Sequence, residues 1–281
     1  MKVGLVPGNA ILRAFSVMNT APPVGAFLGP LLGGPIVDHW GVPALLAIDV
    51  GLMAIVIAAL WVGYHDDFHG TDRGPLLHMA AESVQIITRS PRLRALFPAL
   101  FLLFAGWMLA YAYLPVATTA LYSGDNPGTA IGAVMGAGGL LSVVLGPAVG
   151  ALADRQGHWR TLFWGAAVAT LLWPLPALAP NLIVFGAVWA VVNSIVSAVF
   201  SLSFTVLSNS TTPEVRGRVM SFSYLPVNIG GMVGPAIGSV ITRTSVFTIF
   251  PAAAVLTLAG IGLLAIAARQ AVAPAPGPAL A

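Results

Sequence analysis

The sequence is divided into eight apolar runs of about twenty residues each, and this division limits the folds open to the chain. A helix needs about 20 apolar residues to cross a hydrocarbon core of about 30 Å, and its backbone must satisfy its own hydrogen bonds there. Barrel strands would alternate in polarity over segments of about ten residues, and the runs do not. The sequence therefore predicts an all-α integral membrane protein with eight transmembrane helices, at approximately 15–37, 43–63, 94–119, 130–152, 161–179, 183–207, 220–242 and 246–267.

Charged residues are scarce and unevenly distributed. They make up 7% of the chain, against about 25% for a typical soluble domain, whereas 58% of the residues are hydrophobic. If the spans alternate in direction, all basic residues except Arg243 fall on one side of the membrane. The positive-inside rule then places that side and both termini in the cytoplasm, with the multi-pass chain in the inner or plasma membrane. The residues on that side are Lys2, Arg13, Arg73, Arg89, Arg92, Arg94, Arg155, Arg160, Arg216, Arg218 and Arg269.

Two of the apolar runs contain the same pattern of glycine and proline. Residues 25–34 read GAFLGPLLGG and residues 230–239 read GGMVGPAIGS, without a gap at an offset of 205. Glycines four residues apart leave a strip of helix surface bare, so that another backbone can approach, and the proline predicts a kink. Ordinary close packing would explain one isolated glycine pair, whereas two copies in register indicate a duplicated helix. The pattern consists of Gly25, Gly29, Pro30, Gly33 and Gly34, and of Gly230, Gly234, Pro235 and Gly238.

Two polar connections carry further motifs. Residues 150–162 read GALADRQGHWRTL, in which Asp154 can cap a helix and Gly157 can form a tight turn. Residues 212–222 read TPEVRGRVMSF, where acidic and basic side chains are close enough to form ion pairs. Exposed pairs of this kind are worth only about 0–1 kcal/mol, so they indicate a changing contact better than a stabilising one.

With these motifs the chain resembles the major facilitator superfamily, whose transporters consist of two six-helix halves. GxxxGPxxGG is similar to the fifth helix of its exporters and antiporters, and GALADRQG to the loop between the eighth and ninth helices. TPEVRGRVMSF resembles the segment before the eleventh helix of macrolide-efflux-like and siderophore exporters. The resemblance covers about residues 10–268 and implies that the eight spans are helices five to twelve, with helices one to four absent.

The resemblance also implies where helices and loops meet. Helix five should lie beside helix eight, and the glycine face of helix eleven, which should meet helix two, is expected to be open to lipid or to another chain. The two polar motifs would form a cytoplasmic gate, and the alternative is that the first of them only sets topology. The gate candidates are Gly150, Asp154, Arg155, Gly157, Arg160, Glu214, Arg216 and Arg218.

The predicted organisation has four parts. Residues 1–63 would be the remnant of the N-terminal half, with helices five and six, and residues 94–268 a complete C-terminal half. Residues 64–93 form a polar cytoplasmic linker, in which apolar side chains of the segment PLLHMAAESVQIIT share one helical stripe. The stripe favours an amphipathic helix at the membrane interface, with an ordinary linker helix as the alternative. Residues 269–281 form a Pro- and Ala-rich tail that is predicted to be disordered.

Asp49 is the one carboxylate well inside a predicted span. An ionised carboxylate at the centre of a bilayer costs about 2.5–3.5 kcal/mol. Asp49 is therefore expected either to relay protons or to hydrogen-bond with a neighbour near the headgroups.

Aromatic and amide side chains within the spans are candidates for a substrate cavity. The rings could contact a hydrophobic substrate, or they could belong to an aromatic belt or a packed core. The amides and hydroxyls could give the cavity polarity, or they could hydrogen-bond between helices. The candidates are Trp107, Tyr111, Tyr113, Asn193, Ser194, Ser197 and Asn228.

These features predict a secondary active transporter that exports a small hydrophobic or drug-like compound by alternating access, with protons as the candidate coupling ion. The alternative is a transport-incompetent fragment of such a transporter, or a membrane protein that packs against a partner chain. No enzyme is predicted, because the GAGG of residues 136–139 follows no strand and the histidines form no HExxH motif. Membrane lipid, a small-molecule substrate and protons are the expected partners, without cofactor, metal or nucleic acid.

Overall fold

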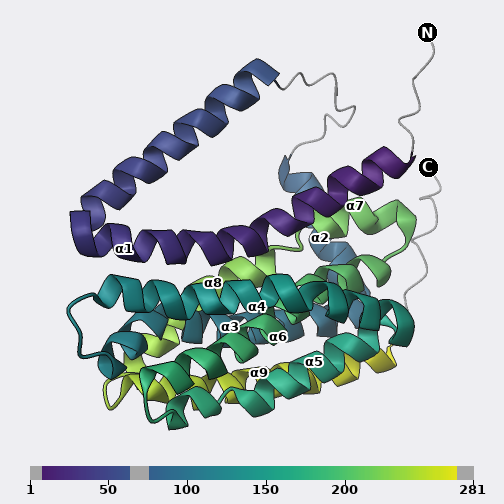
Figure 1. Ribbon diagram of the computed structural model, residues 1–281. Helices are drawn as coiled ribbons and strands as arrows, with labels where there is room; N and C mark the ends of the chain where they lie inside the picture. Colours follow the sequence, from purple (N-terminus) through teal and green to yellow (C-terminus); the bar gives the residue numbers. More distant parts are fainter. Residues whose placement is uncertain (1–7, 64–75, 271–281) are drawn as a thin grey trace, which may run out of the picture.

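All of the regular structure that is described is helical, which confirms the predicted fold class (Figure 1). The structure, a computed structural model, describes the backbone of residues 8–63 and 76–270, and within these ranges the side chains except at 8–20, 23, 76–80, 83, 213 and 214. The helices are α1 (Gly8–Gly63), α2 (Leu76–Arg89), α3 (Pro91–Leu121), α4 (Pro127–Gln156), α5 (His158–Leu172), α6 (Leu182–Asn209), α7 (Pro213–Ser221), α8 (Leu225–Ile241) and α9 (Ile249–Arg269), with the short 3-10 turns η1 (Leu175–Leu178) and η2 (Val246–Thr248).

Seven helical segments of the described chain are long and apolar enough to cross a membrane, one fewer than the eight predicted spans. The difference lies in α1, which contains both of the first two predicted spans. Gly41 has a φ of 78° and a ψ of 170°, so the chain turns sharply there without a polar loop. A side chain would be strained at this φ, and glycine is not. Pro30, where the sequence predicted a kink, lies within the first limb of α1.

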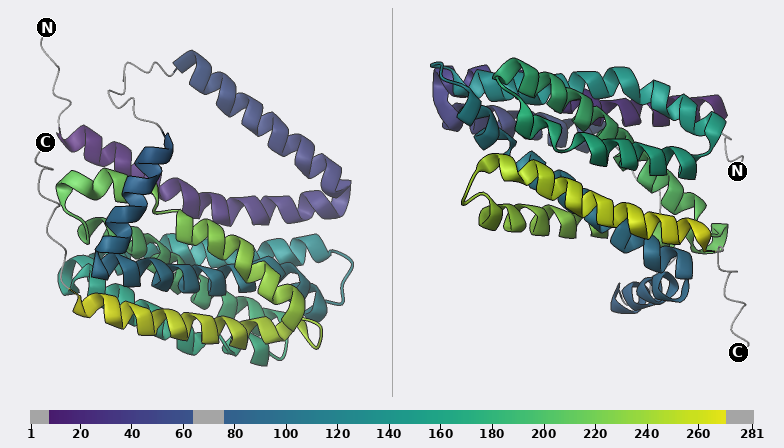
Figure 2. Two further views of the ribbon diagram at one scale, coloured as in Figure 1. Left: turned by 180° about the vertical axis from the view of Figure 1, so that it is seen from behind. Right: turned by 90° about the horizontal axis from the view of Figure 1, so that it is seen from below.

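The bundle is built from α3 to α9, in which α3 runs parallel to α8 and α4 runs parallel to α6. Helix α3 lies at its centre and packs against α8 and α9, while α6 packs against α4 and α5. The first limb of α1 lies along α4, and the second limb turns away from the bundle in Figure 1 and in the left view of Figure 2. Every residue from 46 to 63 is exposed, so the second limb leaves its apolar surface uncovered.

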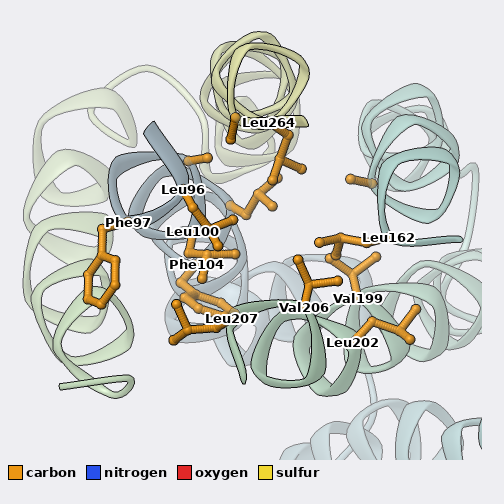
Figure 3. Packing of buried hydrophobic residues seen from close by; sticks show 14 of the residues in the cluster. Leu96, Phe97, Leu100, Phe104, Leu162, Val199, Leu202, Val206, Leu207 and Leu264 are labelled. Carbon is orange, nitrogen blue, oxygen red and sulfur yellow. The ribbon is translucent and has the colours of Figure 1, made fainter. Parts of the chain in front are cut away.

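Buried apolar side chains form two clusters along the bundle. One cluster joins α3, α5, α6 and α9, and Figure 3 shows its leucines, valines and phenylalanines converging between these helices. The other cluster contains the large buried rings Trp173, Trp189, Phe185 and Phe250. Together the two clusters hold the C-terminal six helices as one packed unit.

The described arginines mark one end of the bundle, which we call the basic end. Arg92 and Arg94 stand at the start of α3, and Arg155 stands at the end of α4, which is antiparallel to α3. Arg243 lies in the connection from α8 to α9, at the opposite end. The predicted amphipathic helix is present as α2, which contacts α3 and α7 at the basic end.

Candidate functional site

Helix α1 packs against α4 through a strip of glycines that belongs mainly to α4. A Cβ atom at Gly139 would lie 2.5 Å from the Phe27 backbone nitrogen, and one at Gly136 would lie 3.2 Å from the Phe27 carbonyl oxygen. A Cβ atom at Gly132 would overlap the carbonyl oxygen of Pro30. The expected pairing of helix five with helix eight is therefore present, with backbone against backbone.

The glycines of the first repeat copy contribute less to this contact than their pattern suggests. Gly25 and Gly29 are exposed, and a Cβ atom at either position would meet nothing within 4 Å. Gly33 faces Leu45 of the second limb, and only Gly34 meets α4, at the Gly128 carbonyl. The α4 glycines thus pack against the face of α1 that carries Phe27 and Pro30, and not against the face that carries Gly25 and Gly29.

The glycines of the second copy are buried, and the expectation that this face is open is wrong. Gly230, Gly234 and Gly238 lie against α3, which occupies the groove that their missing side chains leave. A Cβ atom at Gly230 would lie 2.9 Å from the backbone nitrogen of Ala105, and one at Gly238 would overlap the Tyr113 ring. The resemblance implied that helix two covers this glycine face, whereas the structure places α3, a helix of the same half, against it.

Asp38, which the sequence did not single out, connects α1 to the beginning of α4. Its carboxylate accepts hydrogen bonds from the backbone N–H of Gly128 at 2.7 Å and of Thr129 at 2.6 Å. The Thr129 hydroxyl donates a third bond at 2.6 Å. Asp38 falls one residue beyond the predicted span 15–37, and only the tertiary fold brings it to residues about ninety positions away in the chain.

Aromatic rings from α3 and α6 form a continuous row at the centre of the bundle. Trp107 lies 6.1 Å from Tyr111 and 5.5 Å from Phe200, measured between ring centroids. Tyr111 lies 6.4 Å from Trp189, a ring that the sequence did not single out. Edge-to-face pairs at such distances are favourable, and the faces of the rings can accept an apolar or cationic group.

Besides the Trp173 Nε1 beside Trp189, two buried polar atoms at this row have no hydrogen-bond partner within the described residues. They are the Trp107 indole Nε1, a donor, and the Asn193 amide Oδ1, an acceptor. Asn193 is only 8% exposed, and a Cβ atom at Gly138 of α4 would lie 3.0 Å from its Nδ2. Leaving such groups unpaired costs about 1–3 kcal/mol each, so a bound molecule or water that supplies the missing partners would stabilise the site.

A groove of about 670 Å³ runs between α4 and α6 from Ser142 and Ser194 toward the basic end. Its volume is within the range of about 300–1,000 Å³ that is usual for small-molecule sites. Ser142 and Ser194 line the inner part, and Asp154 and His158 line the part at the basic end. Further hydroxyls come from Ser197, Ser201 and Thr205, which share one face of α6.

Comparison with known proteins identifies the family. Residues 1–172 match the family profile described as Major Facilitator Superfamily. The chain belongs to the Major Facilitator Superfamily. This is a family of transporters and not of enzymes, and the chain is accordingly a multi-pass membrane protein.

Curated relatives of this superfamily member carry names of multidrug resistance and efflux proteins. It is 24% identical over 249 residues to the multidrug resistance protein MdtG of Serratia proteamaculans, covering 85% of this chain and 58% of the relative. It is 23% identical over 232 residues to the multi-drug resistance efflux pump PmrA homolog of Lactococcus lactis, covering 81% and 56% respectively. The chain therefore spans less than three fifths of the length of these two relatives.

The superfamily loop motif lies at the basic end of the groove. The Asp154 carboxylate is 3.5 Å from the His158 Nε2, and both residues line the groove. Gly157, between α4 and α5, has a φ of 94°, which favours glycine. Arg155 and Arg160 are exposed, as is Gly150 on α4.

The second gate motif contacts the linker helix. The Arg218 guanidinium on α7 donates to the Glu82 carboxylate of α2 at 2.9 Å. Arg216 is exposed, and the side chain of Glu214 lies outside the described residues. The ion pair that the structure shows thus joins α7 to α2.

The structure brings together only some of the predicted cavity residues of this superfamily member. Trp107 and Tyr111 belong to the ring row, and Asn193 lies next to it, but the groove lining contains none of the three. Asp49 is exposed on the second limb of α1, and Asn228 is exposed on α8. The Tyr113 hydroxyl donates to the Pro235 carbonyl at 3.1 Å, so this ring packs on the glycine strip of α8.

Proposed function

We propose that this chain is a secondary active exporter that moves a small hydrophobic, drug-like compound across the membrane by alternating access. The observation that carries the proposal is the unpaired Trp107 Nε1 and Asn193 Oδ1 beside a row of rings. A substrate with apolar rings and a few polar groups would cover the rings and satisfy both atoms. The printed names of the relatives, multidrug resistance and efflux proteins, support a substrate of this class.

The groove between α4 and α6 is the proposed route from the region of the ring row to the basic end. Ser142 and Ser194 donate their hydroxyl protons to backbone carbonyls of their own helices, which leaves the hydroxyl oxygens as acceptors. With the Asp154 carboxylate at the basic end, the groove favours substrates that carry hydrogen-bond donors, such as amines. In the proposed cycle, helix bundles rock about this central site and expose it to the two sides in turn.

The orientation follows the positive-inside rule. The basic end, with Arg92 and Arg155, is proposed to face the cytoplasm, and so are both chain termini. The groove would then accept substrate from the cytoplasm or the inner leaflet, as an exporter requires. A proton gradient is the proposed energy source, and Asp49 is one candidate for proton coupling.

The test is efflux of ethidium, an aromatic cation, from cells that lack their main drug pumps and express the full chain. We expect efflux that a protonophore abolishes. Trp107→Ala and Asn193→Ala should each raise the apparent KM roughly three- to tenfold, because each removes about one ring contact or polar contact. Trp164→Ala is the matched control, since Trp164 is 58% exposed on the outer surface of α5.

A second candidate function is that of a subunit that acts only with a partner chain. The exposed second limb of α1, residues 46–63, favours it. If the folded chain reaches the membrane and moves no ethidium by itself, the proposal of unaided transport is refuted. Efflux by the purified chain in proteoliposomes would exclude the need for a partner.

A further inference from the structure

Asp38 of α1 caps the N-terminus of α4, a role that usually belongs to the residue just before the helix. The first backbone N–H groups of a helix have no partner within the helix, and a side chain just before it normally accepts from them. In α4 that residue is Asn126, whose side chain makes no capping hydrogen bond. The Asp38 carboxylate of α1 accepts from Gly128 and Thr129 instead.

This arrangement ties the start of α4 to the position of α1. A carboxylate at a helix N-terminus is favoured by the helix dipole only while it is ionised. Separation of α1 from α4 would leave two N–H groups and the Thr129 hydroxyl without this acceptor. The capping interaction is therefore also an interaction between α1 and α4.

The surrounding packing gives the contact little freedom to adjust. A Cβ atom at Gly128 would lie 2.7 Å from the Asp38 Oδ1 and 2.7 Å from the Gly34 carbonyl oxygen. Backbones this close either fit together or separate, because no flexible side chain lies between them. The contact thus has the character of a two-state latch.

The latch lies at the opposite end of α4 from the basic-end mouth of the groove. Asp38 meets the first turn of α4, whereas Asp154 is in its last turn. The groove lining, within the described part of the chain, includes no residue of α1. A movement of α1 that closes the groove would therefore have to change its contact with the first turn of α4.

We infer that Asp38 is a positioning residue whose ionised carboxylate latches α1 to the start of α4, and whose protonation or removal releases that contact. Its role in transport rests on the proposed alternating access, whereas the latch itself does not. Because the latch lies at the end of the bundle opposite the basic end, protons that reach Asp38 from that side would release the α1–α4 contact and so change the state of the transporter. The other titratable groups around the latch are His39 on α1, and Tyr122 and Asp125 in the connection before α4.

The test measures the distance across the latch. The chain contains no cysteine, so Val42→Cys and Ser123→Cys, both at exposed positions, can carry two spin labels without background. In lipid nanodiscs near neutral pH we expect one narrow, short distance. Asp38→Asn should populate a longer, broader distribution, with the ratio of open to closed changed roughly 5- to 30-fold, as loss of a cap predicts.

The pH series distinguishes a latch from a merely structural residue. The unchanged Asp38 should release only when the pH falls below about 4, the ordinary pKa of an aspartate, because the hydrogen bonds of the closed latch favour the ionised carboxylate. Asp38→Asn should show no such change, and Asp38→Glu should retain part of it. His39→Gln removes the imidazole next to Asp38 in the chain, and it should leave the acid release in place.

Two further variants keep the test decisive. Asp125→Asn removes an exposed carboxylate three residues from Gly128 and should behave as the unchanged chain does. If Asp38→Asn does not fold, Thr129→Val removes only one of the three hydrogen bonds and should open the latch partly.

The inference is overturned if Asp38→Asn keeps the short distance, or if its acid response equals that of the unchanged chain. Ethidium efflux is scored separately, so loss of transport with an intact latch refutes only the proposed function.

Discussion

Gly234 of α8 lies directly against Ala105 of α3. A Cβ atom at Gly234 would be 2.5 Å from the Ala105 carbonyl oxygen and 2.8 Å from the Leu109 backbone nitrogen. Gly234 is the repeat counterpart of Gly29, which lies exposed with nothing within 4 Å of its Cβ position. The two copies of one motif therefore have different surroundings in this structure.

Gly234→Ala should destabilise the bundle, whereas Gly29→Ala should not. The added methyl group at residue 234 must push two backbones apart, at a cost of about 1–3 kcal/mol. At residue 29 the methyl group meets open space, and the better helix propensity of alanine could add up to about 1 kcal/mol. Thermal unfolding in detergent, followed by tryptophan fluorescence, measures both. Equal effects of the two substitutions would contradict the packing described for α8.

The Tyr113 ring should contribute more to the stability of the bundle than the Tyr113 hydroxyl does. Tyr113→Phe removes the hydrogen bond to the Pro235 carbonyl and should lower the free energy of unfolding by about 1 kcal/mol. Tyr113→Ala also empties the space over Gly238 and should cost about 3–5 kcal/mol. The same unfolding assay compares the two variants. A larger loss for the phenylalanine variant would contradict this division.

Gly157 should be needed for its backbone conformation. Alanine at a φ of 94° is strained by about 1–3 kcal/mol, so Gly157→Ala should lower the unfolding temperature. Gly150→Ala is the matched control within the same motif, since Gly150 is helical and has nothing within 4 Å of its Cβ position. A stability loss at residue 150 but not at residue 157 would show that the turn has another conformation in solution.

Arg218 and Glu82 should show a small coupling. Their side chains are 51% and 37% exposed, so water and salt screen the attraction. A double-mutant cycle with Arg218→Gln and Glu82→Gln should give a coupling energy of about 0.2–1 kcal/mol that falls in high salt. Single substitutions report other contacts of each residue, which is why the cycle is required. A coupling that is zero at low salt would mean that α2 and α7 are not held together in this way.

Sequence patterns were sufficient for the helical fold and for the family. Apolar runs of about twenty residues allow few structures other than membrane helices, since the backbone must bond to itself in lipid. The predicted spans agree with the helices to within several residues at each end, and the predicted segment of the amphipathic helix matches α2. The exception is Gly41, where a turn without polar residues joins two spans into α1.

The candidate site was predictable only in part. Trp107, Tyr111 and Asn193 share a region because α3 and α6 pack together, and their residue types pointed to it. Tyr113 is only two residues from Tyr111, yet it points to α8, because positions two apart on a helix face different directions. Trp189 was missed because an apolar helix rich in large side chains gives no local signal for a site.

The sequence by itself determined that this chain forms membrane helices, belongs to a transporter family and carries two copies of one glycine–proline helix. These properties depend on local periodicity and composition, which every residue carries wherever it lies in the fold. Only the tertiary structure decided that Gly234 is buried while Gly29 is exposed, and that Asp38 caps a helix about ninety residues away. Such contacts depend on which helix occupies the neighbouring space, and no local pattern encodes that choice.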